Sequence, residues 1–231
     1  MVIELKKTRT IILTVLMLAA LWFLNDLRLE AQYASLYLEN SNYSVQVGMY
    51  ERFRTEHADV VMLGNSLTYN ANWNELLGRS TIANRGIVSD ITAGYLHRLQ
   101  YVYRLSPKLC FIEGGVNDVY AHYTPKQIFN NYRMIIDTLR RHNITPVIQS
   151  TLCVGKGRAE SEKKNDEIRA LNELLKAYTK ENGVVFLDIN ALVTSDGYLR
   201  DELTYDQIHL NAAGYALWVP EVETVLKENG L

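Results

Sequence analysis

A serine, a histidine and an aspartate in this sequence have the side-chain types that one reaction needs. Ser66 directly follows an apolar run in "VVMLGNSLTYN" (60–70), and Asp206 and His209 share the stretch "YDQIHLN". A serine hydroxyl becomes a nucleophile when a base takes its proton, and a carboxylate holds that base in the right tautomer. These residues therefore predict acyl transfer. Serine is also a common helix N-cap, so Ser66 could instead only begin the next helix.

Acyl transfer also needs hydrogen-bond donors that face the negative charge developing on the substrate oxygen. Three donors are predicted for this oxyanion hole: the backbone N–H groups of Ser66 and Gly86, and the side-chain amide of Asn117. Gly86 has no Cβ, so a substrate could approach its backbone closely. Arg85 stands beside this donor, where it could bind a substrate carboxylate or phosphate, or equally form a salt bridge within the fold.

These side chains need a scaffold that brings distant parts of the chain together. Short apolar runs predict five strands, at 59–64, 81–84, 109–115, 146–152 and 184–188. Helical spacing follows at 90–105, 124–142, 161–183 and 211–230, with a kink or break at Pro220 in the last and a short extra helix within 43–56. The alternation predicts a parallel sheet covered on both faces, with the polar stretches at the carboxyl ends of its strands.

Four polar blocks at these strand ends resemble the motifs of GDSL-type (SGNH) hydrolases. They contain Ser66, Gly86, Asn117 and His209, and the resemblance covers about residues 58–220. The stretches "NRGIVSDIT", "GVND", "NDEIRALNELL" and "HLNAAGY" are similar to bacterial members related to platelet-activating-factor acetylhydrolase and to carbohydrate O-acetylesterases. The resemblance implies a flavodoxin-like three-layer α/β/α sandwich with a five-stranded parallel sheet. It also implies ester hydrolysis through an acyl-enzyme, without metal or cofactor.

Three positions depart from the family pattern. Asn65 replaces the usual aspartate before the serine, so we expect altered local hydrogen bonds without loss of activity. Gln207 stands where a glycine is common in the last block, and we expect a slightly different turn there. Cys153 replaces a common proline in a loop near the site.

The N-terminal sequence differs in character from the rest. "KKTR" (6–9) precedes an apolar run over 11–24, which is shorter than the roughly 20 residues of a membrane span. No good cleavage site follows, so our first expectation is an uncleaved membrane anchor. A cleaved signal peptide and a buried helix are the alternatives, in that order. The expected organisation is anchor or signal peptide over 1–30, connector over 31–57 and hydrolase domain over 58–231. The charges around the run predict an extracytoplasmic domain, periplasmic or on the cell surface, or secreted after cleavage.

Overall composition narrows the partners. The 231 residues carry a formal net charge of −2, which argues against nucleic-acid binding. The histidines outside the blocks have no metal-ligand spacing: His57, His97, His122 and His142. Cys110 and Cys153 are expected to be buried thiols rather than a disulfide, because the predicted strands hold them too far apart.

We therefore expect a serine esterase that cleaves short-chain esters, with acetyl as the expected acyl group. The expected substrate is a small ester or an O-acetylated carbohydrate. A lysophospholipase or lipase, an envelope polysaccharide O-acyltransferase and a catalytically silent binding module on the same fold are the alternatives. The oligomeric state, the acceptor and the natural alcohol stay open at this point.

Overall fold

Five parallel strands form the central sheet of the computed structural model, which describes residues 14, 16–18, 20–21, 24, 33 and 35–231. The strand order is β2-β1-β3-β4-β5, in which neighbours are hydrogen-bonded. The strands are β1 (Val60–Gly64), β2 (Ile82–Gly86), β3 (Leu109–Ile112), β4 (Thr145–Gln149) and β5 (Val185–Leu187). All five predicted strands are present, and this order is that of a flavodoxin-like sheet.

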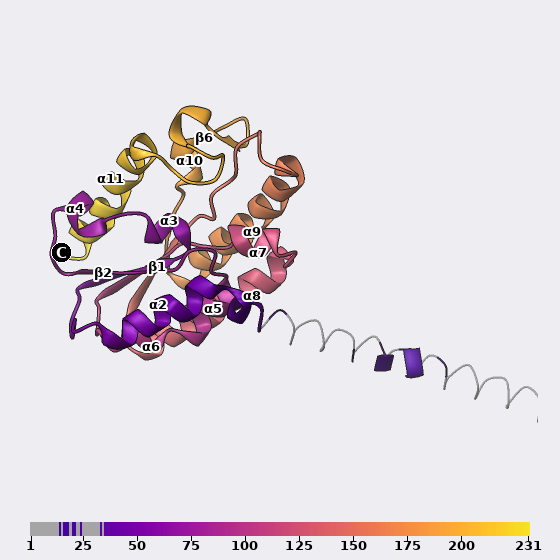
Figure 1. The fold of residues 1–231 in the computed structure, drawn as a ribbon, viewed down its shortest axis with the longest axis horizontal. Coiled ribbons are helices and arrows are strands. Elements are labelled where there is room, and N and C mark those ends of the chain that lie inside the picture. The colour runs from indigo at the N-terminus through magenta and orange to yellow at the C-terminus, as the bar shows by residue number, and fades with distance from the viewer. Residues whose placement is uncertain (1–13, 15, 19, 22–23, 25–32, 34) are drawn as a thin grey trace, which may run out of the picture.

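Both faces of the sheet are covered, so successive side chains of a strand enter two different cores. Val61 and Leu63 pack into one core, whereas Val60 and Met62 pack into the other. The first core is closed by η1 (Leu36–Glu39), α2 (Ser41–Arg52), α5 (Thr92–His97), α6 (Gln100–Tyr103), α7 (Val116–Tyr120), α8 (Pro125–Arg141) and α9 (Ser161–Asn182). The second is closed by α3 (Ser66–Tyr69), α4 (Trp73–Leu77), α10 (Asn190–Val193) and α11 (Ala212–Glu228). The expected three-layer α/β/α sandwich is confirmed (Figure 1).

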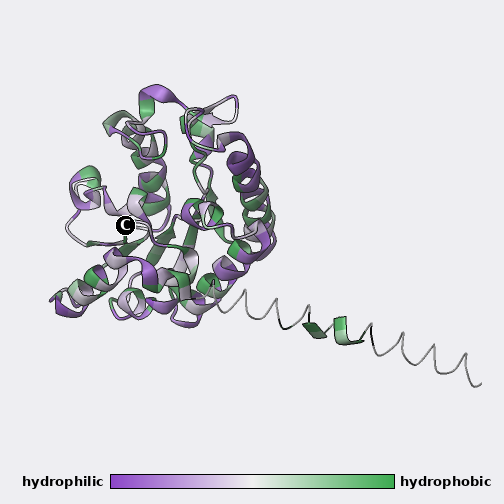
Figure 2. Cartoon of the chain, turned by 45° about the vertical axis from the view of Figure 1, so that its right-hand side comes forward, coloured by the Kyte–Doolittle hydropathy of each residue, from purple (hydrophilic) through white to green (hydrophobic). Residues whose placement is uncertain are grey.

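Hydropathy follows the layers. In Figure 2 the strands between the two helical layers are largely hydrophobic, whereas the outer helices alternate between hydrophobic and hydrophilic residues. In β1 and β3, near the centre of the sheet, every residue is buried. Parallel strands buried on both faces carry such continuous apolar runs.

Two of the predicted helices differ from expectation. The segment 90–105 forms two short helices, α5 and α6, because the backbone at Arg98 leaves the helical region with φ −125°. The predicted break at Pro220 does not occur, and α11 continues through this residue. Pro220 and Ala216 are both exposed, so the Ala216 carbonyl that lacks a helical donor faces solvent.

Local signals explain two other helix ends. Thr124 and Gln127 form a capping box at the start of α8, with Pro125 at its first position. Gly183 ends α9 with φ +60°, the left-handed conformation that glycine adopts readily. The thiols of Cys110 and Cys153 are free and buried, as predicted.

The predicted anchor or signal peptide over 1–30 lies almost entirely outside the described residues. Among those that are described, no helix is long and apolar enough to cross a membrane. A short antiparallel pair, β6 (Thr194–Ser195) and β7 (Tyr198–Leu199), and the 3-10 helix η2 (Asp201–Leu203) lie between α10 and α11 and were not predicted.

Candidate active site

Ser66, His209 and Asp206 form a hydrogen-bonded chain, although 143 positions separate the serine from the histidine. Nε2 of His209 lies 2.8 Å from Ser66 Oγ, and His209 Nδ1 lies 2.6 Å from Asp206 Oδ2. Ser66 is 7% exposed, while the His209 side chain is 23% exposed. The serine is therefore nearly buried, whereas the histidine side chain is partly exposed to solvent. The three side chains are arranged as nucleophile, base and orienting carboxylate.

Asn65, rather than Ser66, caps the helix that follows β1. Its Oδ1 accepts a hydrogen bond from Leu67 N at 2.8 Å, and its carbonyl accepts one from Tyr69 N at 2.9 Å. Ser66 is thus the first residue of α3, with its hydroxyl free to meet His209. The N-cap interpretation of Ser66 is therefore wrong. The expected change in local bonding is found in Asn65, whose Nδ2 is buried without a partner among the described residues.

The turn that carries Asp206 and His209 is held internally by Thr204. Thr204 Oγ1 donates to the His209 carbonyl at 2.7 Å and accepts from the N–H of Gln207 at 3.0 Å. Asp206 Oδ1 accepts from the N–H groups of Ile208 and His209, at 3.0 and 2.8 Å. Thr204 is a positioning residue that sequence reasoning missed, since an isolated threonine before a turn carries no distinctive signal.

Asp206 is held in its charged form by these contacts. Partial burial acts to raise the pKa of Asp206, but hydrogen bonds from the N–H and ring of His209 and from Ile208 N–H outweigh it. The pKa of Asp206 is lowered below its ordinary value as a result. A carboxylate that stays ionised can orient the imidazole and stabilise its positive charge after proton transfer.

Gln207 occupies its turn in a backbone conformation typical of glycine, so the expected difference in the turn stays a prediction. Its backbone has φ +73°, a conformation that glycine adopts at less cost. Side-chain bonds compensate: Oε1 accepts from Gly157 N at 3.0 Å, and Nε2 donates to Asp201 Oδ1 at 3.1 Å. The Gln207 carbonyl also accepts from Gly155 N at 2.7 Å. The loop around residues 155–157 is therefore tied to the turn that carries His209.

Asn117 stands at the start of α7, directly after the third strand. Its Nδ2 donates to the Asp90 carbonyl at 2.8 Å, and the second N–H of this amide stays available. Because α7 follows β3 and the Asp90 turn follows β2, both lie at ends of the strands that flank β1. Asn117 therefore lies at the carboxyl end of a strand beside β1, and its role as an oxyanion donor stays a prediction.

Gly86 does not have the predicted role. Its N–H already donates to Asn84 Oδ1 at 2.8 Å, so it is not free for an oxyanion. A Cβ at this position would lie 2.3 Å from Tyr69 N, because α3 packs directly on the end of β2. Glycine is needed here for close packing under the nucleophile's helix, which also explains its place in the motif.

A different residue of the same motif offers a free N–H. Asp90 N bonds to the Ile87 carbonyl at 3.2 Å and closes a turn, with Ser89 at φ +59° in its third position. The Ser89 N–H meets no acceptor among the described residues, and Ser89 lines a hollow together with Asn117. Sequence reasoning missed Ser89 because a positive φ is usually indicated by a glycine in the sequence, and here the residue is a serine.

Arg85 is not placed to bind a substrate. It is 2% exposed, and its guanidinium donates to the carbonyls of Tyr101 and Asn84 and lies over the rings of Tyr50 and Phe53. Arg85 is therefore bound within the fold, but through carbonyl hydrogen bonds and aromatic contacts and not through the expected salt bridge, which it forms with none of the described residues. Its pKa is lowered to about 10, first by burial, which leaves it charged at neutral pH.

A buried ion pair fixes the strand ends around the site. Arg98 Nε lies 2.8 Å from Asp90 Oδ2, and neither side chain is exposed. The same guanidinium donates to the carbonyls of Arg85 and Gly64, at 2.6 and 3.0 Å. One side chain therefore joins the ends of β1 and β2 to the turn that carries Ser89. Breaking such a pair is costly, because the remaining charge stays buried.

The model of the GDSL-like lipase/acylhydrolase family matches residues 62–217, which span the whole of this site. The chain belongs to the GDSL-like lipase/acylhydrolase family. It is therefore a carboxylic ester hydrolase by family, and the resemblance seen in its motifs is confirmed.

Curated relatives of this acylhydrolase are longer proteins. The N-acylneuraminate cytidylyltransferase of Streptococcus agalactiae serotype V is 26% identical over 183 residues. The match covers 76% of this chain and 42% of the relative, so the chain spans less than half of that protein's length. A second such cytidylyltransferase, from serotype III, is also 26% identical.

Solved structures share the acylhydrolase fold. A GDSL-like lipase from Bacteroides thetaiotaomicron superimposes with a TM-score of 0.71 at 23% identity, covering 81% of this chain and 98% of that one. The acetyl xylan esterase AlAXEase gives a TM-score of 0.62 at 19% identity, covering 72% and 98%. These likenesses show the fold.

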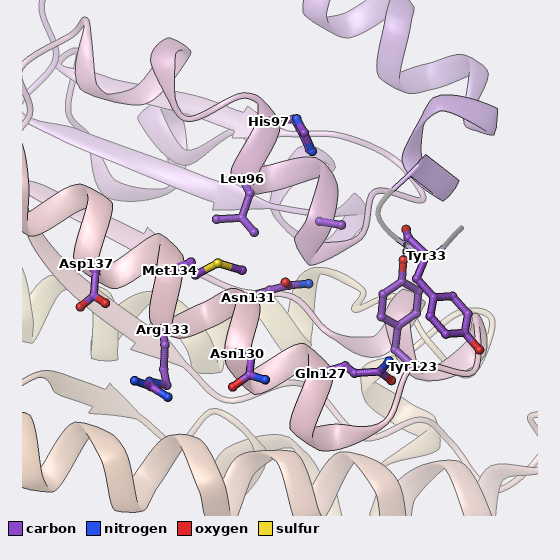
Figure 3. Close-up of a pocket in the computed structure, with 11 residues that line it drawn as sticks. Tyr33, Leu96, His97, Tyr123, Gln127, Asn130, Asn131, Arg133, Met134 and Asp137 are labelled. Carbon is purple, nitrogen blue, oxygen red and sulfur yellow. Dashed lines mark hydrogen bonds between the residues drawn. The ribbon is translucent and has the colours of Figure 1, made fainter. Parts of the chain in front are cut away.

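The acylhydrolase also has a hollow of about 570 Å³ between α5 and α8 (Figure 3). Tyr33 and Tyr123 lie together at one end of it, with ring centroids 4.5 Å apart. No member of the Ser66–His209–Asp206 chain lines this hollow, and Asn131 on its wall already donates to Thr92 Oγ1 at 2.8 Å. We therefore place the candidate site at the triad.

Glu113 is a buried carboxyl at the end of β3, close behind the site. Neither of its oxygens has a hydrogen-bond partner among the described residues. Burial, and then repulsion from Asp118, raises the pKa of Glu113 to about 8 from 4.5. The folded protein therefore keeps this proton at neutral pH. The unfolded chain releases it above about pH 4.5, so the group lowers stability as pH rises from there towards 8.

Glu113→Gln is expected to flatten this pH dependence, because the amide is neutral throughout. The difference between the free energies of unfolding of the variant and of the wild type should increase, in favour of the variant, by about 1.4 kcal/mol for each pH unit between pH 5 and 8. Urea unfolding of both full chains at several pH values measures the difference. Asp118 is present in both proteins and serves as an internal control. Parallel stability curves would show that Glu113 does not titrate in this range.

Proposed function

We propose that this chain is a serine esterase that removes a short acyl group from an alcohol oxygen, with a preference for acetyl. The observation that carries the proposal is the chain of hydrogen bonds from Ser66 Oγ through His209 to Asp206. A serine within 2.8 Å of an imidazole that is itself oriented by a carboxylate has the arrangement of an activated nucleophile.

In the proposed reaction, Ser66 Oγ attacks the ester carbonyl carbon while His209 Nε2 takes the hydroxyl proton. The N–H groups of Ser66 and Ser89 and the amide of Asn117 stabilise the oxyanion. His209 then gives the proton to the leaving alkoxide, and an acyl-enzyme forms. Water repeats the cycle and releases the acid.

A sugar hydroxyl is the favoured source of the alcohol. The matched relatives are named for an N-acylneuraminate, an acylated sugar acid, although the chain spans only 42% of the length of the first. The motif "NRGIVSDIT" also resembles acetylhydrolase-like members of the family. Together these support an O-acetylated carbohydrate as the substrate class.

An acyl-length series tests the esterase proposal against a lipase. With p-nitrophenyl acetate, butyrate and octanoate, the full chain is expected to show the highest kcat/KM for acetate. A pocket that binds a longer chain would gain on the order of 1 kcal/mol or more for each methylene. A steady rise in kcat/KM with chain length would replace the esterase proposal by the lipase one.

Two further readouts distinguish the esterase from an acyltransferase and from a silent binding module. An acyltransferase would form an acylated sugar faster than free acid when a saccharide acceptor is added. A silent binding module would not react with a fluorophosphonate probe. We expect rapid labelling that depends on Ser66, and release of free acid.

We also propose that residues 1–30 place the domain outside the cytoplasm. The support is the basic cluster Lys6, Lys7 and Arg9 ahead of the apolar run 11–24. Membrane fractionation and protease protection of the full-length protein measure this. Recovery of a soluble form that begins near Gln32 would replace the anchor by a cleaved signal.

A further inference from the structure

The segment that precedes the family-matched region bonds directly to the candidate active site. The family match begins at residue 62, yet Asn40 Nδ2 donates to the Val88 carbonyl at 2.8 Å. Ten residues further along, the Tyr50 hydroxyl donates to the Gly86 carbonyl, also at 2.8 Å. Asn40 additionally caps α2 through its Oδ1, which accepts from Asn42 N. The connector is therefore fixed to the loop beside the nucleophile.

These bonds hold the turn that carries Ser89 from a second side. Asn117 Nδ2 donates to the Asp90 carbonyl, and Asn40 Nδ2 donates to the Val88 carbonyl. Two side-chain amides therefore form hydrogen bonds with the residues on either side of Ser89. The turn begins where Ile87 N bonds to the Gly64 carbonyl at 3.0 Å, at the end of β1. Connector, turn and nucleophile thus meet at one edge of the sheet.

A cavity of about 230 Å³ lies where the connector, the turn and α7 meet. Leu36 and Tyr37 of the connector, Ile91 after the turn, and Tyr120 and Ala121 after Asn117 supply its apolar surface. None of the described residues that line it carries a charge. Such a lining favours an uncharged, apolar group.

The polar residues that line this cavity are Asn40, Ser89 and Asn117, and the last two are the groups assigned to the oxyanion. A substituent of the carbonyl carbon must therefore lie near its entrance. Neither Ser66 nor any described residue of the turn that carries Asp206 and His209 lines it, so the link to the reacting carbon is through Ser89 and Asn117. The alcohol oxygen has to stay beside His209, which protonates it, so the acyl chain is the substituent left for the cavity.

We propose that this cavity binds the acyl group of the substrate, and that Leu36 and Tyr37 of the connector limit its length. The assignment rests on the proposed esterase function. It makes a segment outside the family-matched region a determinant of specificity.

Substitutions at Leu36 test the assignment in the full chain. The measured quantity is the ratio of kcat/KM for p-nitrophenyl hexanoate to that for the acetate. Leu36→Ala enlarges the cavity and is expected to raise this ratio about tenfold, whereas Leu36→Trp should lower it by a similar factor. Ala121→Leu fills the cavity from α7 and should also lower the ratio, independently of the connector.

Leu38 provides the matched control, because it lies in the same 3-10 helix but is 65% exposed and does not line the cavity. Leu38→Ala and Leu38→Trp should leave the ratio unchanged. Circular dichroism establishes that each variant is folded. If the wild type is active and the Leu36 and Ala121 variants have the same ratio as the wild type, the acyl assignment alone is overturned. A dependence on the alcohol instead of the acyl chain overturns it as well. A wild type that hydrolyses no ester overturns the proposed function together with this assignment.

Discussion

Ser66→Ala is expected to reduce kcat for p-nitrophenyl acetate on the order of 10⁴- to 10⁶-fold and to abolish labelling by a fluorophosphonate probe. The hydroxyl is the atom placed to attack, since its oxygen lies 2.8 Å from the His209 base. The substitution removes one hydroxyl and leaves the cap of α3 intact, because Asn65 supplies that cap. The variant should therefore stay folded.

His209→Ala should cost about as much, and the double variant should be little worse than either single one, because nucleophile and base act as a unit. Asp206→Ala should be milder, since the base remains. Ser44→Ala is a matched control: Ser44 is exposed and bonds to the nearby Ser41 carbonyl. A folded Ser66→Ala protein with near wild-type turnover would refute the catalytic assignment.

Asn117→Ala is expected to lower kcat by roughly 100- to 1,000-fold with little change in KM, the usual loss for one oxyanion donor. The reason is that the amide acts on charge that develops only in the transition state. Steady-state kinetics with p-nitrophenyl acetate measures both constants. Because the same amide holds the Asp90 carbonyl, circular dichroism of the variant is needed beside the kinetics.

Asn182→Ala is the control for this change, because Asn182 is exposed and its amide donates within its own helix to the Tyr178 carbonyl. It should leave both constants unchanged. A rise in KM at constant kcat in Asn117→Ala would show that Asn117 binds the ground state and the transition state equally. That result would remove Asn117 from the oxyanion hole.

Much of the fold could be predicted because its signals are local. The five buried strands are short apolar runs, and the capping box at Thr124 and the stop at Gly183 depend only on neighbouring residues. The juxtaposition of Ser66, His209 and Asp206 could also be predicted, since each of them follows a strand or lies in a polar turn. In a parallel sheet the carboxyl ends of the strands meet at one edge, which brings Ser66 and His209 together.

Which backbone N–H groups of the site motif stay free was decided only by the tertiary structure. Gly86 and Ser89 lie in one short motif, and both could supply an N–H. Which N–H is free depends on the Asn84 side chain, which binds that of Gly86, and on the turn that leaves that of Ser89 without an acceptor among the described residues. Helix α3, which packs against Gly86, begins about twenty residues earlier in the chain.

The burial of Arg85 and the contacts of the connector were likewise decided by residues far apart in the sequence. A cation beside the site motif could face either the substrate or the interior, and packing of Tyr50 and Phe53 against it determines that it is buried. Asn40 and Val88 are 48 positions apart, so no local pattern links them. The amino-acid sequence by itself therefore determined the strands, the helix ends and the types of the catalytic side chains. Long-range contacts decided which backbone groups stay free, which charge is buried and which segment lines the cavity beside Ser89 and Asn117.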